Sequence, residues 1–212
     1  TTLIKSLAKY VYRTTHQMSP MALPLALWRM DKNVRAVYLT FDDGPIPEVT
    51  PWVLDVLDHY GIKATFFMVG DNVRKHPEIY EMVKQRGHRI GNHTFNHIGS
   101  LRHGINSYMR NVEKANAYLR TDLFRPPHGW MKPALYVAAR LKYRVVMWDL
   151  VTRDYSKRLN GRDVLRNVQR YARNGSIITF HDSLKSHDKI LYALPRAIEW
   201  LRDQGYEFKV FD

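Results

Sequence analysis

The chain has 212 residues, of which 45% are hydrophobic and 25% are charged. These values are typical of one globular domain with a sizeable apolar core, and they exclude a disordered chain. The chain contains no cysteine, so disulfide frameworks, thiolate zinc sites, iron–sulfur clusters and cysteine nucleophiles are excluded. Any metal must therefore be held by His, Asp, Glu or water.

The chain is strongly basic, with 33 Lys and Arg residues against 20 Asp and Glu residues and a formal net charge of +13. Such a charge favours anionic partners such as nucleic acid, lipid head groups or acidic wall polymers. The basic residues are spread along the chain, and no zinc-finger spacing, glycine-flanked aromatic signature or basic heptad array accompanies them. We therefore expect no nucleic-acid partner.

The N-terminal segment, residues 1–35, is predicted to be helical or extended and to pack on the following domain or lead into it. It mixes aliphatic and basic residues at first, and a proline-interrupted apolar stretch follows over Met18–Trp28. The alternative is a basic amphipathic segment in peripheral contact with a membrane or the cell envelope. No run of about 18 apolar residues occurs, so no membrane span is predicted.

From Ala36 onward, short β-branched runs alternate with stretches of helical period, which is typical of strand–helix units on a parallel sheet. Thr50 is a predicted helix N-cap followed by Pro51, and three glycines mark predicted helix ends, at Gly61, Gly87 and Gly205. Seven strands are predicted, at Val37–Phe41, Ala64–Val69, His88–Gly91, Leu123–Arg125, Arg144–Trp148, Ser176–Phe180 and Glu207–Phe211. Residues 36–212 are expected to form one α/β domain.

Titratable and turn-forming residues gather directly after five of these strands. Each group alone has a structural explanation, such as a turn, a chance pair of histidines, a rigid proline loop or a helix cap. Loops after the carboxyl ends of parallel strands converge on one face, however, so the joint placement predicts a functional site. The five segments are Thr40–Pro45, Asn92–His97, Arg125–Gly129, Trp148–Tyr155 and His181–Asp182.

Asp43, His93 and His97 are the candidate metal ligands. One carboxylate and two imidazoles can hold Zn²⁺ or a similar ion and leave positions open for water and substrate, as catalytic sites require. Such an ion polarises a carbonyl group and lowers the pKa of water. The predicted cofactor is Zn²⁺, Co²⁺ or another divalent metal.

Two candidate proton carriers accompany these ligands. Asp42 is free to take a proton from water, and Arg125 would orient it and keep it ionised. His181 can protonate a leaving amine if a carboxylate keeps it cationic. Asp154 is the candidate for that carboxylate and Asp149 is its rival. The set predicts metal-assisted hydrolysis of an amide or ester.

The ordered motifs closely resemble those of the polysaccharide deacetylases, carbohydrate esterase family four, which contain the nodulation-type chitooligosaccharide deacetylase homology domain. The resemblance covers Val37 to Asp182. It implies a distorted (β/α) barrel of about seven parallel strands and the removal of N-acetyl groups from chitin- or peptidoglycan-type sugars or, less favoured, of O-acetyl groups from xylan. The motifs are Thr40-Phe41-Asp42-Asp43-Gly44, His93-Thr94-Phe95-Asn96-His97, Arg125-Pro126-Pro127-His128-Gly129, Asp154-Tyr155 and Phe180-His181-Asp182.

The roles that the resemblance implies agree with those argued from the residues: Asp42 is the base, His181 is the acid, Arg125 is the partner of the base, and the metal ligands are the three given above. The resemblance adds two roles. It implies that Asp154 tunes His181 and that the backbone amide of His128 helps to hold the oxyanion.

Three predicted substrate-binding residues depart from the family pattern. Tyr155 stands where Trp is usual, Thr179 where a Leu often lines the acetyl pocket, and His128 where Tyr is common. These departures affect the shape of the pocket and the sugar preference rather than the reaction. A Thr hydroxyl makes an acetyl pocket less apolar unless Ile178 or Phe180 supplies its wall.

We expect a monomeric enzyme that acts on an acetylated glycan in the cell envelope or outside the cell; the site of action is inferred mainly from the resemblance. Trp130 and Tyr155 are candidates for stacking on sugar rings. One alternative is a metal oxygenase with two His and one carboxylate, which would have no need for Asp42 and His181 as proton carriers. The other is a non-catalytic glycan- or envelope-binding module, which would be expected to lack a ligand or the base, and this chain lacks none.

Overall fold

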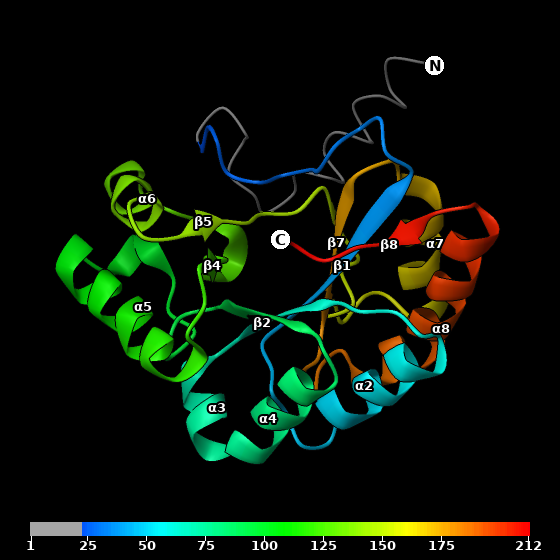
Figure 1. Cartoon of the computed structure of the whole chain (residues 1–212), viewed down its shortest axis with the longest axis horizontal. Helices are drawn as coiled ribbons and strands as arrows, with labels where there is room; N and C mark the ends of the chain where they lie inside the picture. Colours follow the sequence, from blue (N-terminus) through cyan, green and yellow to red (C-terminus); the bar gives the residue numbers. More distant parts are fainter. Residues whose placement is uncertain (1–22) are drawn as a thin grey trace.

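The computed structural model describes residues 23–212, which form a curled parallel sheet covered by helices (Figure 1). Within this range the sheet has the order β5-β4-β3-β2-β1-β7-β6, and β8 pairs with the start of β1. This arrangement confirms the predicted distorted (β/α) barrel. The strands are β1 (Ala36–Asp42), β2 (Thr65–Met68), β3 (Arg89–Asn92), β4 (Leu123–Phe124), β5 (Arg144–Val145), β6 (Leu150–Val151), β7 (Ser176–His181) and β8 (Glu207–Phe208).

Helices connect the strands and pack on the outside of the sheet. In Figure 1, α5 and α6 lie at the left, α3 and α4 at the bottom, and α2, α7 and α8 at the lower right and right. Two short 3₁₀ turns, Ser100–Arg102 and Pro127–Gly129, lie in loops. The helices are α2 (Thr50–His59), α3 (Gly70–Lys75), α4 (Pro77–Gln85), α5 (Ile105–Leu119), α6 (Pro133–Arg140), α7 (Gly161–Tyr171) and α8 (His187–Asp203).

The predicted helix ends are confirmed, but the predicted N-cap is wrong. Gly61, Gly87 and Gly205 follow α2, α4 and α8 with φ angles of 62°, 79° and 79°, a region that favours glycine. Thr50, in contrast, lies inside the first turn of α2, and Val49 takes the cap position without a side-chain bond. The Thr50 hydroxyl is used elsewhere, as described below.

The predicted strand Arg144–Trp148 is shorter in the structure, and it is followed by a strand that was not predicted, β6. β5 ends at Val145 and β6 begins at Leu150 because these two strands lie at opposite edges of the sheet. Residues 146–149 cross from one edge to the other and bring the edges of the curled sheet together. Leu27 pairs with Val146 and Arg29 pairs with Ser176 along this seam.

Alternation along β1 and β7 divides their side chains between two environments. Leu39, Phe41 and Phe180 pack with the helices in one core cluster, and Phe41 stacks on Phe180 with ring centroids 5.9 Å apart. The other set of side chains, which includes Asp42 and His181, faces the interior of the barrel. Asp42 and His181 are also register partners across the β1–β7 ladder.

Most of the predicted N-terminal segment, residues 1–22, lies outside the described residues. The part that is described packs on the barrel: Leu23 is fully buried, and the Tyr136 hydroxyl donates a hydrogen bond to the Pro24 carbonyl. Among residues 23–212, no helix has the length and apolar character that crossing a membrane requires.

Candidate active site

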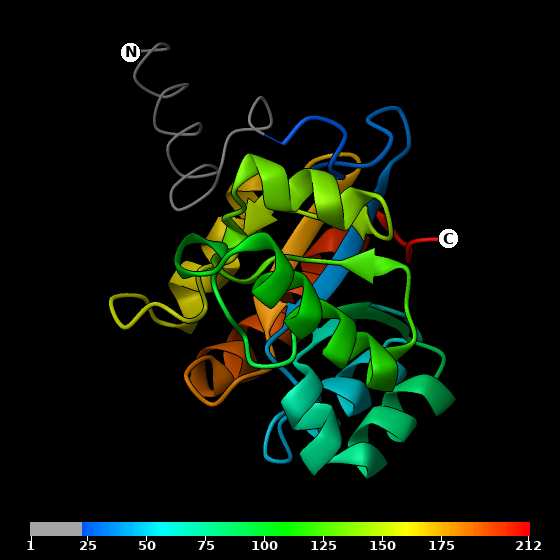
Figure 2. The same ribbon diagram turned by 90° about the vertical axis from the view of Figure 1, so that its left-hand side faces the viewer.

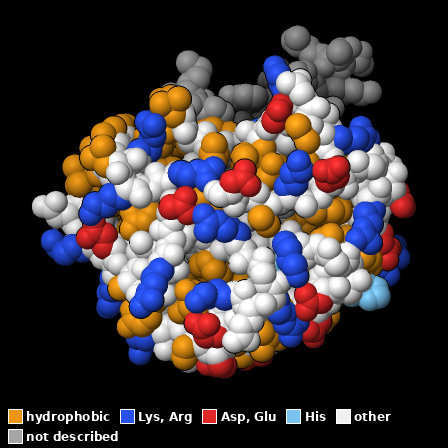
Figure 3. Space-filling model, viewed as in Figure 1, with side chains coloured by type: hydrophobic (Ala, Val, Ile, Leu, Met, Phe, Trp, Pro, Cys, Tyr) orange, Lys and Arg blue, Asp and Glu red, His pale blue; other side chains and the backbone are white. Residues whose placement is uncertain are grey.

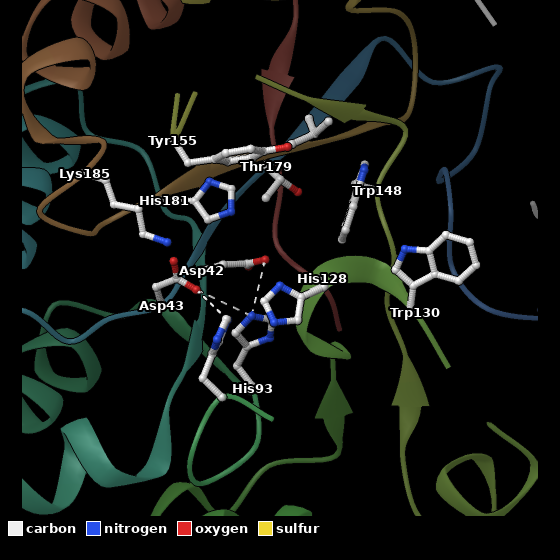
Figure 4. A pocket seen from close by; sticks show the side chains of 12 residues that line it. Asp42, Asp43, His93, His128, Trp130, Trp148, Tyr155, Thr179, His181 and Lys185 are labelled. Atoms are coloured by element: carbon white, nitrogen blue, oxygen red, sulfur yellow. Dashed lines mark ion pairs between the residues drawn. The ribbon is translucent and has the colours of Figure 1, made fainter. Parts of the chain in front are cut away.

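A pocket of about 320 Å³ lies where β1, β3 and β7 end (Figure 4). Most of the site residues predicted from the sequence line it. Arg125 and Asp154 instead lie behind its wall, and both are fully buried. The lining residues are Asp42, Asp43, His93, His97, His128, Trp130, Trp148, Val151, Tyr155, Thr179, His181 and Lys185.

Asp43 follows β1 in the left-handed conformation, with φ of 84°. The side-chain amide of Asn72 donates a hydrogen bond to the Asp43 carbonyl oxygen at 2.8 Å. The Asp182 carboxyl accepts from the Gly44 N–H at 3.2 Å and from the Thr50 hydroxyl at 2.6 Å. Burial raises the pKa of Asp182 to about 8, so a second full negative charge is not forced beside Asp43. The sequence motif did not reveal this use of Asp182 and Thr50.

Gly44 has no room for a side chain. A Cβ atom at this position would lie 2.1 Å from Asp182 Oδ2. We expect Gly44→Ala to lower the free energy of unfolding by about 2 kcal/mol or more, because the loop and a buried carboxyl must both move. Urea unfolding measures this change. Gly104→Ala is the matched control, since a Cβ at Gly104 meets nothing within 4 Å, and equal losses in the two variants would contradict the steric argument.

The turn after β3 presents two imidazoles to Asp43. Thr94 and His97 adopt positive φ angles of 65° and 54°, and the Thr94 N–H donates to the side-chain oxygen of Asn92 at 2.9 Å. The Nε2 atoms of His93 and His97 lie 3.7 Å and 3.1 Å from Asp43 Oδ1 (Figure 4). The conformation of the turn therefore places the two rings on the same side as the carboxylate.

Asp43, His93 and His97 fit a divalent cation. Their ligand atoms all lie within 4.8 Å of one another, and ligands about 2.0 Å from a tetrahedral ion stand about 3.3 Å apart. His93 Nδ1 donates to the Arg125 carbonyl at 2.7 Å, which leaves the lone pair on Nε2. Burial lowers the pKa of His93 to about 4, so the ring is neutral at pH 7 and can bind a metal.

The charge state of Asp43 suits the same role. Burial opposes its ionisation, but the hydrogen bond with His97 and the charge of His181 outweigh burial and hold the pKa of Asp43 well below its usual range. Asp43 therefore remains an anionic ligand across the physiological range of pH.

Asp42 is held from behind by a fully buried arginine. Arg125 Nη1 donates to Asp42 Oδ1 at 2.7 Å and to the Thr40 hydroxyl at 2.8 Å. The other side of the guanidinium donates to the carbonyl oxygens of Val146 and Met147 at 3.3 Å and 2.7 Å. These bonds fix the Asp42 carboxylate and leave Oδ2 directed toward the ligand cluster, 3.9 Å from His93 Nε2.

Asp154, rather than its rival Asp149, contacts His181. Asp154 Oδ1 lies 2.7 Å from His181 Nδ1, and Oδ2 accepts from the His181 backbone N–H at 2.7 Å. Burial alone would lower the pKa of His181, but the charge of Asp154 outweighs burial and raises the pKa to about 9. The ring is therefore cationic at neutral pH. Asp149 instead accepts from Arg173 and Ser176, at the opposite end of β7.

Thr179 lines the pocket, but its hydroxyl is engaged. Thr40 donates to the Ile178 carbonyl at 2.9 Å, so in the 3.2 Å contact between Thr40 and Thr179 the Thr179 hydroxyl is the donor. Ile178 and Phe180 belong to the core beneath the helices and do not supply the wall, because alternation turns them away from the barrel interior. Val151 lines the pocket there instead.

Aromatic and basic side chains form the rim. His128 has a positive φ of 62° and packs edge-on against His97, with ring centroids 4.9 Å apart. Tyr155 packs edge-on against His181 at 5.0 Å, and Trp130 is 41% exposed. Lys185, which the sequence analysis missed, points its ammonium group toward Asp43 (Figure 4). Its place three residues after the His181-Asp182 pair was the only available signal.

Comparison with known proteins identifies the family. The sequence pattern described as polysaccharide deacetylase matches residues 29–146. The chain belongs to the polysaccharide deacetylase family. Deacetylases of this family are metal-dependent, and among residues 23–212 Asp43, His93 and His97 form the cluster able to hold an ion.

The chain is similar to a peptidoglycan-N-acetylglucosamine deacetylase of Bacillus cereus, with 32% identity over 85% of this chain and 88% of the relative. It is also similar to a chitooligosaccharide deacetylase of Sinorhizobium fredii, with 34% identity over 84% and 91% of the two chains. The crystal structure of the Bc1960 peptidoglycan N-acetylglucosamine deacetylase superposes with a TM-score of 0.83 and 30% identity, covering 88% of this chain and 91% of that chain. The chain spans 38–39% of some longer relatives.

Proposed function

We propose that this polysaccharide deacetylase hydrolyses N-acetyl groups on a glycan of the peptidoglycan or chitooligosaccharide type, with O-acetyl groups as less favoured substrates. The observation that carries the proposal is the position of two proton carriers of opposite character, Asp42 and His181, beside one cluster of candidate metal ligands. Relatives named for peptidoglycan and for chitooligosaccharides support the substrate class. We propose residues 36–212 as the catalytic domain.

Asp43, His93 and His97 would hold the cation. Bound there, Zn²⁺, Co²⁺ or another divalent ion would polarise the acetyl carbonyl and make water more acidic. All three residues line the pocket, where an acetyl group has access. The absence of a thiolate ligand favours ions that accept nitrogen and oxygen donors.

Asp42 is the proposed base. Because Arg125 occupies Oδ1, the free Oδ2 accepts the proton of the water that attacks the acetyl carbon. The backbone amide of His128 is proposed to donate to the oxygen that becomes negative. The buried guanidinium keeps the carboxylate in position throughout the reaction.

His181 is the proposed acid. Its Nδ1 donates to Asp154, so Nε2 carries the second proton toward the pocket and delivers it to the departing amine. Asp154 keeps the ring protonated until that step. Tyr155, Thr179 and His128 are the proposed substrate-binding residues, and Trp130 offers an exposed ring at the rim on which a sugar can stack.

The proposal is tested by removing and restoring metal. Chelator treatment is expected to reduce acetate release to background, and stoichiometric Zn²⁺ or Co²⁺ is expected to restore it. Acetate is measured with N-acetylglucosamine oligomers, peptidoglycan fragments and acetylated xylan, and Asp42→Ala serves as the blank. Release that survives complete metal removal would contradict the mechanism.

Oligomer binding and dioxygen consumption, measured on the same preparations, separate the alternatives. A glycan-binding module would bind the oligomers and release no acetate from any of them. A metal oxygenase would consume dioxygen with the iron-loaded protein. We propose that the enzyme is a monomer without a nucleic-acid partner and that it acts in the envelope or outside the cell, in keeping with the substrates named for its relatives.

A further inference from the structure

One face of the protein combines exposed aliphatic side chains with positive charge, and the three segments that build it contain no acidic residue. It is built from residues 23–30, 97–112 and 123–148, which contain no Asp or Glu although the chain has 20 of them. We name it the acid-free face. Of the ten large hydrophobic side chains exposed among residues 23–212, six lie in these segments: Leu25, Leu101, Ile105, Trp130, Val137 and Leu141.

The three segments are neighbours in space. The Ser100 hydroxyl donates to the Trp130 carbonyl at 3.0 Å, and Lys132 Nζ donates to the His103 carbonyl at 3.0 Å. The Tyr136 hydroxyl, on α6, bonds to the Pro24 carbonyl. Figure 2 shows α5 and α6 side by side, and Figure 3 shows hydrophobic side chains gathered over the α6 corner with Lys and Arg between them.

The charge of this face is only partly compensated. Six exposed cations lie in the three segments: Arg102, Arg110, Lys132, Arg140, Lys142 and Arg144. Glu113 and Asp122, at the border, form ion pairs with Lys142 and Arg144. The other four form no ion pair with an acidic side chain of the described residues.

We propose that the acid-free face binds the surface of an anionic lipid bilayer. Lipid phosphates complement the cations, and the protruding aliphatic side chains can enter the boundary between head groups and acyl chains. An acidic polymer would neutralise the same charges but leave Leu25, Val137 and Leu141, which are 76%, 61% and 83% exposed, in water. The combination therefore favours a lipid surface.

The geometry links this surface to the catalytic pocket. Trp130 belongs to the acid-free face and also lines the pocket. Docking through this face would bring Trp130, and with it the side of the pocket that it lines, next to the bilayer, so the enzyme would act on glycan close to the membrane surface. This inference concerns where the enzyme works and does not depend on which acetyl group it removes.

The full chain is tested by sedimentation with vesicles of phosphatidylglycerol and phosphatidylcholine, and with phosphatidylcholine alone. We expect binding to the anionic vesicles that weakens with added salt, and little binding to the neutral ones. Val137→Ser/Leu141→Ser and Arg102→Glu/Arg140→Glu are each expected to weaken partitioning by about tenfold or more. Acetate release from a soluble oligomer should remain unchanged and reports on folding.

Matched controls lie on other surfaces. Leu184→Ser/Leu191→Ser changes two exposed leucines outside the face, and Arg162→Glu/Arg170→Glu changes the net charge equally on α7; both should bind like the unmodified chain. No binding to anionic vesicles would overturn the proposal. Vesicle binding that is equally strong in both face variants and in the unmodified chain would also overturn it. A third contradicting result would be binding to polyglutamate as strong as binding to vesicles and unchanged in Val137→Ser/Leu141→Ser.

Discussion

Asp42→Asn is expected to lower kcat/KM by about a thousandfold, within the range for loss of a general base. The amide has the shape of the carboxylate and can still accept the Arg125 hydrogen bond, but it cannot take a proton from water. The variant should still bind one equivalent of metal, because Asp42 is not among the candidate ligands. Steady-state acetate release and metal analysis check both expectations.

A buried guanidinium without its counterion also costs stability, so the control must separate folding from catalysis. Asp149→Asn is matched, because Asp149 is another buried carboxylate paired with an arginine, Arg173. It should lower Tm and leave kcat/KM nearly unchanged. If Asp42→Asn retains activity within tenfold of the unmodified enzyme, the proposed base is wrong.

Asp154→Asn is expected to move the alkaline limit of activity. The catalytic ring must be protonated, and Asp154 raises the pKa of His181 to about 9, so the unmodified enzyme should lose activity as the pH rises through about 9. Without the Asp154 carboxylate, burial, which is the largest influence on the ring, favours its neutral form, and only the smaller effects of the Asp43 and Asp42 charges still raise its pKa. The decline should then begin below about pH 6.5, the ordinary value for His.

The pH profile of kcat/KM measures this shift. At pH 8 we expect a loss of about 30-fold or more, because only a small fraction of His181 would remain protonated. Activity of the variant should recover in part toward pH 6, which a misfolded enzyme would not do. An alkaline limit that stays near pH 9 in Asp154→Asn would exclude His181 as the acid that Asp154 supports.

The sequence predicts the site well where the chemistry is local. His93 and His97 are four residues apart in one turn, and Asp42 and Asp43 are adjacent at the end of a strand, so strand ends and motif order were sufficient to bring them together. The parallel strands converge on one edge whatever the exact lengths of the connecting helices. That is why ligands, base and acid could be proposed before the fold was known.

Contacts between distant segments were not predictable in the same way. Asp154 and Asp149 both follow the predicted strand Arg144–Trp148, and only the position of the unpredicted strand β6 beside β7 places Asp149 at the far end of β7. The Asp182 contact with Thr50 joins residues 132 positions apart, and Thr50 looked like a helix cap by local rules. Lys185 carries no motif, and only its place shortly after the end of β7 connects it with the pocket.

The position of Arg125 ties catalysis to the completion of folding. Its guanidinium donates to the base on one side and to the Val146 and Met147 carbonyls on the other, and those carbonyls belong to the crossing that joins the two edges of the sheet. The guanidinium therefore has all of its hydrogen-bond partners only when this crossing has joined the two edges of the sheet. During refolding, the recovery of acetate release should consequently lag behind the recovery of the circular-dichroism signal of the helices. The rate of turnover would then report on closure of the barrel.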